Sequence, residues 1–237
     1  MTLAHISIPD GLRVRTKNNR LDEKVDADYF QLVEKFRLGT LEPAEFQTAC
    51  LEFFEPLLAN GHFDEIIGET MNSTNHEVEL LRRHVDECRY TVIFYRVDEG
   101  MVHPPHYHHN VVSTQVVVRG KIRIREYDRV RRNDDGQLVL KLTSDRILRE
   151  GDTFLASEWK DNVHWFQAVD GPALIFNTNA RGYERQVFEP DANSFGRRYV
   201  DPTCLDGEGL AVCEAFDVEE AQKRFQWKSL DDFPVAG

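Results

Sequence analysis

The sequence lacks any long uninterrupted apolar run. No stretch approaches the roughly 18 apolar residues that a membrane-spanning helix requires. The first residues, MTLAHISIPDGLRVRTK, also contain no apolar core of the kind that a signal peptide needs. We therefore expect a soluble, cytoplasmic protein.

Basic residues are scarce relative to acidic ones. The chain has 29 Lys and Arg against 41 Asp and Glu, a formal net charge of −12. Nucleic acids and anionic membranes are bound by clustered Lys and Arg. The densest basic run, residues 123–132, is interrupted by Glu126 and Asp128, which favours a solvated strand and turn. The sequence therefore predicts neither a nucleic-acid nor a membrane partner.

Cysteine is also rare, and its spacing is not that of a disulfide framework. The four cysteines are far apart and form no CxxC pair. This pattern predicts free thiols in a reducing compartment and not a disulfide framework. The chain also lacks a dinucleotide-binding fingerprint, so no nicotinamide cofactor is expected.

The first 88 residues have helical periodicity and are interpreted as a helical N-terminal extension. Apolar residues recur at helical spacing in residues 27–37 and 43–58. A capping-box pattern at residues 74–77 precedes a third apolar segment, residues 78–85. The sequence therefore predicts three amphipathic helices here.

The pattern changes to short β-rich runs from residue 89 to about residue 190. Several short strands separated by turn residues indicate a sandwich or a barrel. A helix is predicted again at residues 217–227, with Asp217 as its N-cap, inside a C-terminal extension of residues 191–237. The predicted strands are residues 90–97, 112–119, 121–127, 137–142, 152–157, 163–169 and 173–178.

Histidines are concentrated in one stretch, VHPPHYHHN at residues 102–110, which holds four of the nine in the chain. A strand directs every second side chain to one face, so His106 and His108 can converge while His109 faces away. His164, on a later predicted strand, is the obvious third ligand. Catalytic metal sites commonly use three protein ligands and keep other positions open. These three histidines are therefore the predicted metal ligands.

The same stretch resembles the first motif of the cupin superfamily. From Gly100 to Gly120 the chain has a glycine, five residues, HxH, four residues, Ser113, six residues and a glycine. The family usually has a glutamate ligand where Ser113 stands. Gly151 to His164 is similar to the second cupin motif, with a longer loop. The resemblance implies a mainly β fold, a double-stranded β-helix (jelly-roll) barrel spanning residues 89–190.

The three-histidine pattern resembles that of thiol dioxygenases related to cysteine dioxygenase, and that of diketone-cleaving dioxygenases. This resemblance implies Fe(II) as the cofactor and a small anionic or chelating substrate (a thiol, diketone or phenolic acid) with dioxygen as its partner. Imidazole also suits Zn, Mn and Ni, so the sequence leaves the metal open. A homodimer is a further expectation. The alternatives are a metal-dependent isomerase or lyase, and a cupin that binds a metabolite without catalysis.

Several polar residues are candidates for contacts with substrate. Gln115 shares a strand face with Ser113 and can bond a ligand, or can be a buried amide satisfied by backbone. Arg96 is the first candidate for an anion clamp, with Arg89, Arg123, Arg125 and Arg181 as competitors. Tyr183 is either an active-site phenol or a core or rim tyrosine. His103 is expected to be a partly exposed loop residue. The alternatives are a fourth metal ligand and a hydrogen-bond donor beside the metal ligands. Trp165 and Phe166 are expected to line the pocket or core.

Overall fold

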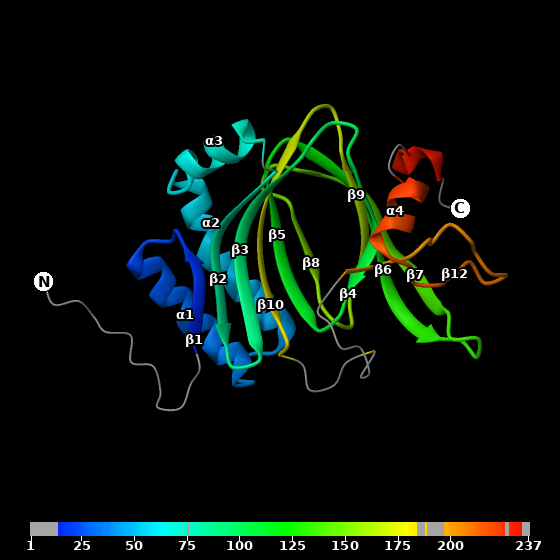
Figure 1. Ribbon diagram of the computed structural model, residues 1–237, viewed down its shortest axis with the longest axis horizontal. Coiled ribbons are helices and arrows are strands. Elements are labelled where there is room, and N and C mark those ends of the chain that lie inside the picture. Colours follow the sequence, from blue (N-terminus) through cyan, green and yellow to red (C-terminus); the bar gives the residue numbers. More distant parts are fainter. Residues whose placement is uncertain (1–13, 75, 184–187, 189–196, 226–227, 234–237) are drawn as a thin grey trace, which may run out of the picture.

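Two curled antiparallel sheets of six strands each form the centre of the molecule (Figure 1). This computed structural model describes residues 14–74, 76–183, 188, 197–225 and 228–233. The first sheet has the order β1 (Val14–Asn19), β2 (Glu77–Val85), β3 (Cys88–Val97), β10 (Ala173–Arg181), β5 (Val111–Arg119), β8 (Thr153–Ala156). The second sheet has the order β11 (Arg197–Tyr199), β4 (Val102–His108), β9 (Val163–Ala168), β6 (Lys121–Arg132), β7 (Leu138–Arg149), β12 (Ala211–Cys213).

The predicted fold class is confirmed. The chain is mainly β and forms a barrel of two facing antiparallel sheets, with helices before and after it. An apolar core that includes Val117, Ile124, Phe154 and Ile175 fills one part of the space between the sheets. Polar side chains line the remaining space, where the candidate site lies.

Three helices cover the outer face of the first sheet: α1 (Glu23–Arg37), α2 (Pro43–Ala59) and α3 (Asp64–Asn72). The Asp22 side chain accepts a hydrogen bond from the Val25 amide at the start of α1, and Pro43 occupies the first turn of α2, where its missing N–H costs little. Buried aromatic rings on these helices pack on Tyr90 and Phe176 of the sheet. The predicted helices at residues 27–37 and 43–58 are confirmed.

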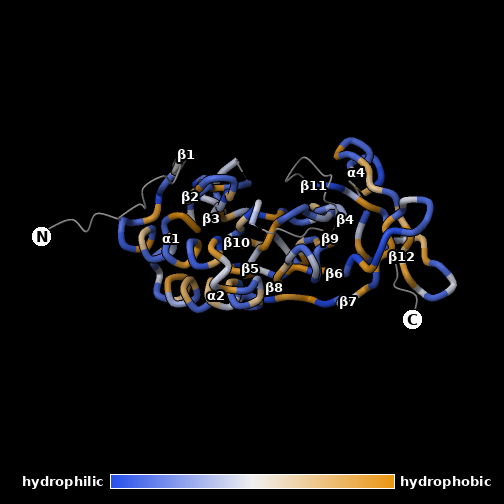
Figure 2. The backbone as a smooth tube through the Cα atoms, turned by 90° about the horizontal axis from the view of Figure 1, so that it is seen from below, coloured by the Kyte–Doolittle hydropathy of each residue, from blue (hydrophilic) through white to orange (hydrophobic). Residues whose placement is uncertain are grey.

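The C-terminal helix α4 (Val218–Phe225) lies on the second sheet, and the Phe225 ring packs edge-on against Trp165 with centroids 5.3 Å apart. Its amide at Glu220 donates to the Asp217 carboxylate at 2.9 Å, which confirms the predicted N-cap. A short 3-10 helix, η1 (Leu230–Asp232), follows. Figure 2, turned by 90°, shows α1 near one end of the molecule and α4 near the other.

The predicted helix at residues 78–85 is wrong, because this segment is strand β2. A register shift between Glu79 and Leu81 inserts an extra residue, and Leu80 and Leu81 are both fully buried. This bulge interrupts the period-two alternation that would have indicated a strand. The divisions at residues 88 and 190 stay predictions, and residues 184–187 and 189–196 lie outside the described part of the chain.

The state of the cysteines and the apolar character of the helices can be read from the structure. All four cysteines are free, as expected, and three of them are buried. None of the helices in the described residues is long and apolar enough to cross a membrane.

Candidate metal centre

The register of β4 and β9 brings the predicted ligands together. His106 lies directly opposite His164 in this antiparallel pair. Directly opposed residues project from the same face of a sheet, and His108 projects from that face two residues later. All three side chains therefore enter the space between the sheets.

A bulge in β4 adds a fourth histidine to this face. The register shifts between His103 and His106, where Pro104 and Pro105 supply no backbone donor to the ladder. Three residues of β4 are therefore matched by two residues of β9, and His103 lies opposite Phe166. Its ring stacks on the Phe166 ring, with centroids 4.5 Å apart and planes 10° apart. His103 is thus a partly buried strand residue in the cavity wall and not the loop residue that we predicted.

The three imidazoles form a compact cluster. The ring centroid of His106 lies 4.4 Å from that of His164 and 5.0 Å from that of His108. One nitrogen of each ring lies within 4.8 Å of the others. Three histidines in this arrangement can hold a metal ion.

The hydrogen bonds of these rings fit a metal ion. The Nδ1 of His106 lies 2.7 Å from the carbonyl oxygen of Pro104, so the neutral ring donates there and keeps a lone pair on Nε2. That Nε2 is buried and has no hydrogen-bond partner among the described residues, and the same is true of Nδ1 of His108. Buried polar atoms without partners are rare, and a metal ion satisfies such nitrogens.

The environment keeps the cluster neutral. Burial lowers the pKa of His164 to about 3, and the positive charge of Arg197 adds to the effect. Burial, His164 and Arg197 likewise hold the pKa values of His106 and His108 well below the usual range. The rings are therefore deprotonated at neutral pH, which is the state that binds a metal.

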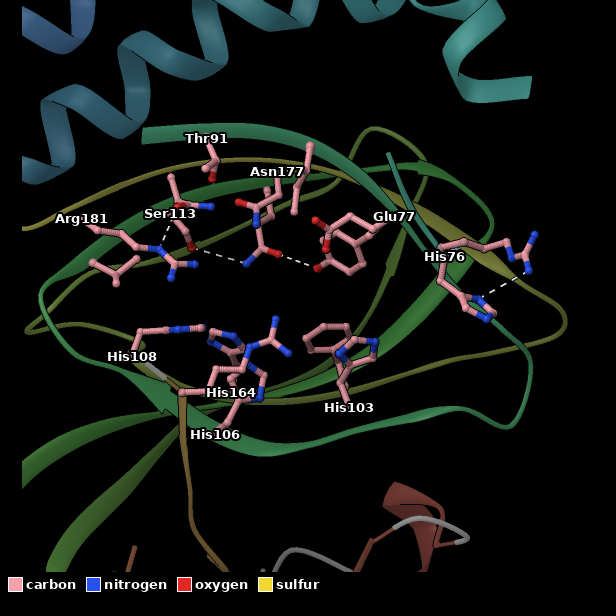
Figure 3. Close-up of a pocket in the computed structure, with 18 of the residues that line it drawn as sticks. His76, Glu77, Thr91, His103, His106, His108, Ser113, His164, Asn177 and Arg181 are labelled. Carbon is pink, nitrogen blue, oxygen red and sulfur yellow. Dashed lines mark hydrogen bonds between the residues drawn. The ribbon is translucent and has the colours of Figure 1, made fainter. Parts of the chain in front are cut away.

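The cluster forms one wall of a cavity of about 580 Å³. Figure 3 shows the histidines in one row, with Thr91, Ser113 and Asn177 in a facing row on the first sheet. The cavity is of the size that holds a small molecule.

A chain of hydrogen bonds runs along the facing wall. The Tyr95 hydroxyl donates to Oε1 of Gln115 at 2.6 Å, and Nε2 of Gln115 lies 3.5 Å from Oγ of Ser113. Gln115 therefore lines the cavity and has its amide fixed by Tyr95. Ser113 also faces the cavity, where it presents a short neutral side chain.

Arg96 reaches the cavity rim, but its guanidinium is already engaged. It donates to Asp98 at 2.6 Å and to the backbone oxygen of Met71 at 2.5 Å, which ties β3 to the end of α3. Tyr183 does not line the cavity; its ring packs on Phe36 of α1, with centroids 4.4 Å apart. The substrate roles of both residues stay predictions.

The remaining candidates are divided between the cavity and the outside of the barrel. Phe166 lines the cavity and Trp165 packs outward against α4, as alternation requires. His109 also turns away, with Nδ1 3.9 Å from the buried Glu158. Arg123 and Arg125 bind Asp145 outside the cavity, whereas Arg89 and Arg181 line it.

Sequence reasoning missed several cavity residues that share a simple signal. On β10, polar side chains recur at every second position and point inward, while their neighbours pack under the helices. The same alternation holds on β3. A period-two reading would have found Thr91, Tyr95, Asn177 and Asn179.

No known protein family matches the sequence, and no curated protein matches it. Among solved structures, KdgF from Halomonas sp. is 20% identical, with 45% of this chain and 77% of KdgF covered and a TM-score of 0.31. A cupin superfamily protein from Desulfitobacterium hafniense is 11% identical, with 45% and 76% covered and a TM-score of 0.31. Procruciferin, an 11S globulin from Brassica napus, is 11% identical, with 38% and 20% covered and a TM-score of 0.30. The chain thus spans a fifth of procruciferin, and similarity at this level assigns no activity.

Proposed function

We propose that the chain is a metal-dependent enzyme acting on a small molecule, and that its reaction is an iron(II)-dependent oxygenation by dioxygen. One observation carries this proposal. Three buried, neutral imidazoles converge at the wall of a polar cavity, and no carboxylate of the described residues joins them. The resemblance of the histidine motif to three-histidine dioxygenases supports the choice of reaction.

The ligand set favours an anionic donor from the substrate. Three neutral ligands leave the charge of a divalent ion unchanged, whereas a glutamate at Ser113 would lower it by one unit. A thiolate, an enolate or a carboxylate is therefore attracted to this site. Iron(II), when bound, supplies redox chemistry and open coordination positions, as in non-haem oxygenases.

The residues of the chain position the substrate. The stacked pair of His103 and Phe166 offers a flat aromatic wall beside the cluster. Opposite it, the amide of Gln115 is held by Tyr95 and presents fixed polar atoms to a ligand. Both atoms of dioxygen enter the product in this reaction, so the substrate supplies all the electrons and no nicotinamide or 2-oxoglutarate is consumed.

Oxygen uptake tests this function. The protein is purified without oxygen, loaded with Fe(II), and mixed with thiols, β-diketones and phenolic acids in an oxygen electrode. We expect uptake with one of these classes, and two atoms of ¹⁸O in the product when ¹⁸O₂ is supplied. His164→Ala should abolish uptake, whereas His62→Ala, outside the cavity, should not.

Two outcomes bear on the alternatives. No oxygen uptake across all three classes by protein that retains iron contradicts the proposal. Turnover that is supported by Zn, Mn or Ni and needs no oxygen would instead indicate an isomerase or lyase. A homodimer and a cytoplasmic location remain separate proposals, which light scattering and cell fractionation would test.

A further inference from the structure

Four arginines line the cavity at one end, where β3 begins and β10 ends. Arg181 of β10 lies directly opposite Arg89 of β3, so both side chains leave the same face of the sheet. Arg82 of β2 lies opposite Thr91 of β3, one rung further along that face. All three side chains line the cavity.

The fourth arginine comes from the other sheet. Arg197 of β11 lies directly opposite His108 of β4, so its side chain shares the face that carries the histidines. Figure 3 shows Arg181 at the same end of the cavity as His108 and Ser113, with His76 at the opposite end. The arginine cluster, Arg82, Arg89, Arg181 and Arg197, is therefore adjacent to the candidate metal centre.

Like charges directly opposite each other in a sheet repel, so the pairing of Arg89 with Arg181 calls for a group of opposite charge beside it. Two carboxylates lie nearby among the described residues: Glu79, which pairs with Arg82, and Glu77 on the cavity wall. Four guanidinium groups share one end of the cavity, with these two carboxylates nearby.

Two of these arginines also have a hydrogen-bond donor atom that no other described residue uses. The Nε atoms of Arg82 and Arg89 are buried and have no hydrogen-bond partner among the described residues. Burial first, and then the charges of Arg89, Arg197 and Arg82, lower the pKa of Arg181 to about 10. A charged, multidentate acceptor would accept hydrogen bonds from these guanidinium groups and offset their mutual repulsion.

We propose that the arginine cluster binds a doubly charged oxyanion group of the substrate, a phosphate ester or a dicarboxylate, while a second donor of the same molecule faces the three histidines. As a statement about substrate, this rests on the proposed function; anion binding itself requires no metal. The polar side chains of Thr91 and Asn179, on the neighbouring rung, add short hydrogen-bonding groups beside the guanidinium groups.

This assignment also moves the anion clamp away from Arg96, our first candidate from sequence. The guanidinium of Arg96 is occupied by Asp98 and by backbone oxygens of α3. Arg89 and Arg181 lie opposite each other on β3 and β10 and line the cavity, where Nε of Arg181 donates to Asn179 at 3.1 Å.

The experiment uses metal-free protein, so that its result is independent of any oxygen chemistry. Binding of inorganic phosphate, succinate and acetate is measured by calorimetry at constant ionic strength. We expect phosphate or succinate to bind at least ~10-fold more tightly than acetate, because one more charge-assisted contact contributes about that factor. Tighter phosphate binding indicates a phosphate ester as substrate, and tighter succinate binding indicates a dicarboxylate.

Substitutions of single arginines test where the anion binds. Arg89→Gln and Arg181→Gln should each weaken binding of the preferred dianion by about 10-fold or more. Arg119→Gln, on an exposed side chain paired with Glu150 outside the cavity, should leave it unchanged. Arg89→Gln should also raise the Tm of the ligand-free protein, because it removes a repulsion.

The outcomes separate this proposal from the proposed function. Equal binding of acetate and both dianions, or unchanged dianion binding in both cavity variants, overturns the arginine site whatever the oxygen electrode shows. If a variant does not fold, thermal stabilisation of the wild-type protein by the anions tests the site instead. Phosphate or succinate must raise the wild-type Tm more than sodium chloride of equal ionic strength does. No such difference also overturns the proposal.

Discussion

His106 and His164 lie directly opposite each other on β4 and β9, with ring centroids 4.4 Å apart. The hydrogen-bonded register of two strands therefore fixes their separation, and no mobile loop is needed to bring them together. Because strands hold side chains more precisely than loops do, the site is organised before any ion binds. The backbone contacts of Pro104 and Asp161 with these two rings further restrict their orientation.

A carboxylate introduced at Ser113 should favour metal binding and disfavour anion binding. Ser113→Glu places a negative charge on β5, facing the histidines. We expect divalent metal to bind as tightly as before or more tightly, and phosphate or succinate to bind less tightly, because the cavity loses one unit of positive charge. Ser113→Gln, of similar size but neutral, is the matched control. Equal effects of the two substitutions on metal and anion affinity would contradict this charge argument.

The buried pair of Arg129 and Glu158 should be important for stability near the site. The Glu158 carboxylate accepts hydrogen bonds from Arg129 at 2.8 Å and from the backbone amide of Asn110 at 2.6 Å, just after the histidine strand. Glu158→Gln leaves the arginine charge buried without its partner, which should lower the free energy of unfolding by about 3–5 kcal/mol. Glu69→Gln, which breaks an exposed pair with Arg20, should lower the free energy of unfolding far less, because solvent screens that pair.

Urea unfolding of the two variants measures this difference. The Glu158 variant should also bind metal less tightly, since Asn110 follows the histidines along the chain. Similar losses of stability in the two variants would show that the buried pair stabilises the protein no more than the exposed pair does.

The turn between β5 and β6 should tolerate no side chain. Gly120 has φ of +76°, and a Cβ there would lie 2.5 Å from the backbone oxygen of Pro172. Gly120→Ala should therefore cost about 2 kcal/mol or more, from both strain and collision. Gly136 has φ of +79° with no atom within 4 Å of a Cβ, so Gly136→Ala should cost only about 1 kcal/mol. Thermal or urea denaturation measures the stability that each variant loses. Equal losses in Gly120→Ala and Gly136→Ala would show that the contact with Pro172 has no effect.

Much of the barrel could be predicted because its strands are short, β-rich and separated by strong turn signals. The same holds for the three histidines, whose spacing is regular within β4. Local patterns of this kind depend on neighbouring residues alone.

The missing parts depend on contacts between distant segments or on irregular strands. The bulge at Glu79 conceals the alternation of β2, and with it the inward position of Arg82. The bulge after His103 reverses the face that a regular strand would give that residue. Arg197 enters the site only through the pairing of β11 with β4, which no local pattern indicates.

Metal content of alanine variants tests the central claim most directly. Each protein is loaded with Fe(II), desalted and analysed by plasma emission spectroscopy, with folding checked by circular dichroism. We expect His106→Ala, His108→Ala and His164→Ala each to lose tightly bound metal, because two imidazoles leave an incomplete site.

The neighbouring histidines are the controls in that measurement. His109→Ala should keep metal near the wild-type level, because its side chain turns to Glu158, and His103→Ala should lose at most ~10–100-fold in affinity, as for a group beside the ligands. Loss of metal from the three ligand variants with retention in His109→Ala is the result that the account predicts. A folded His108→Ala protein that keeps its metal, together with a His109→Ala protein that loses it, would contradict the strand register and the site built on it.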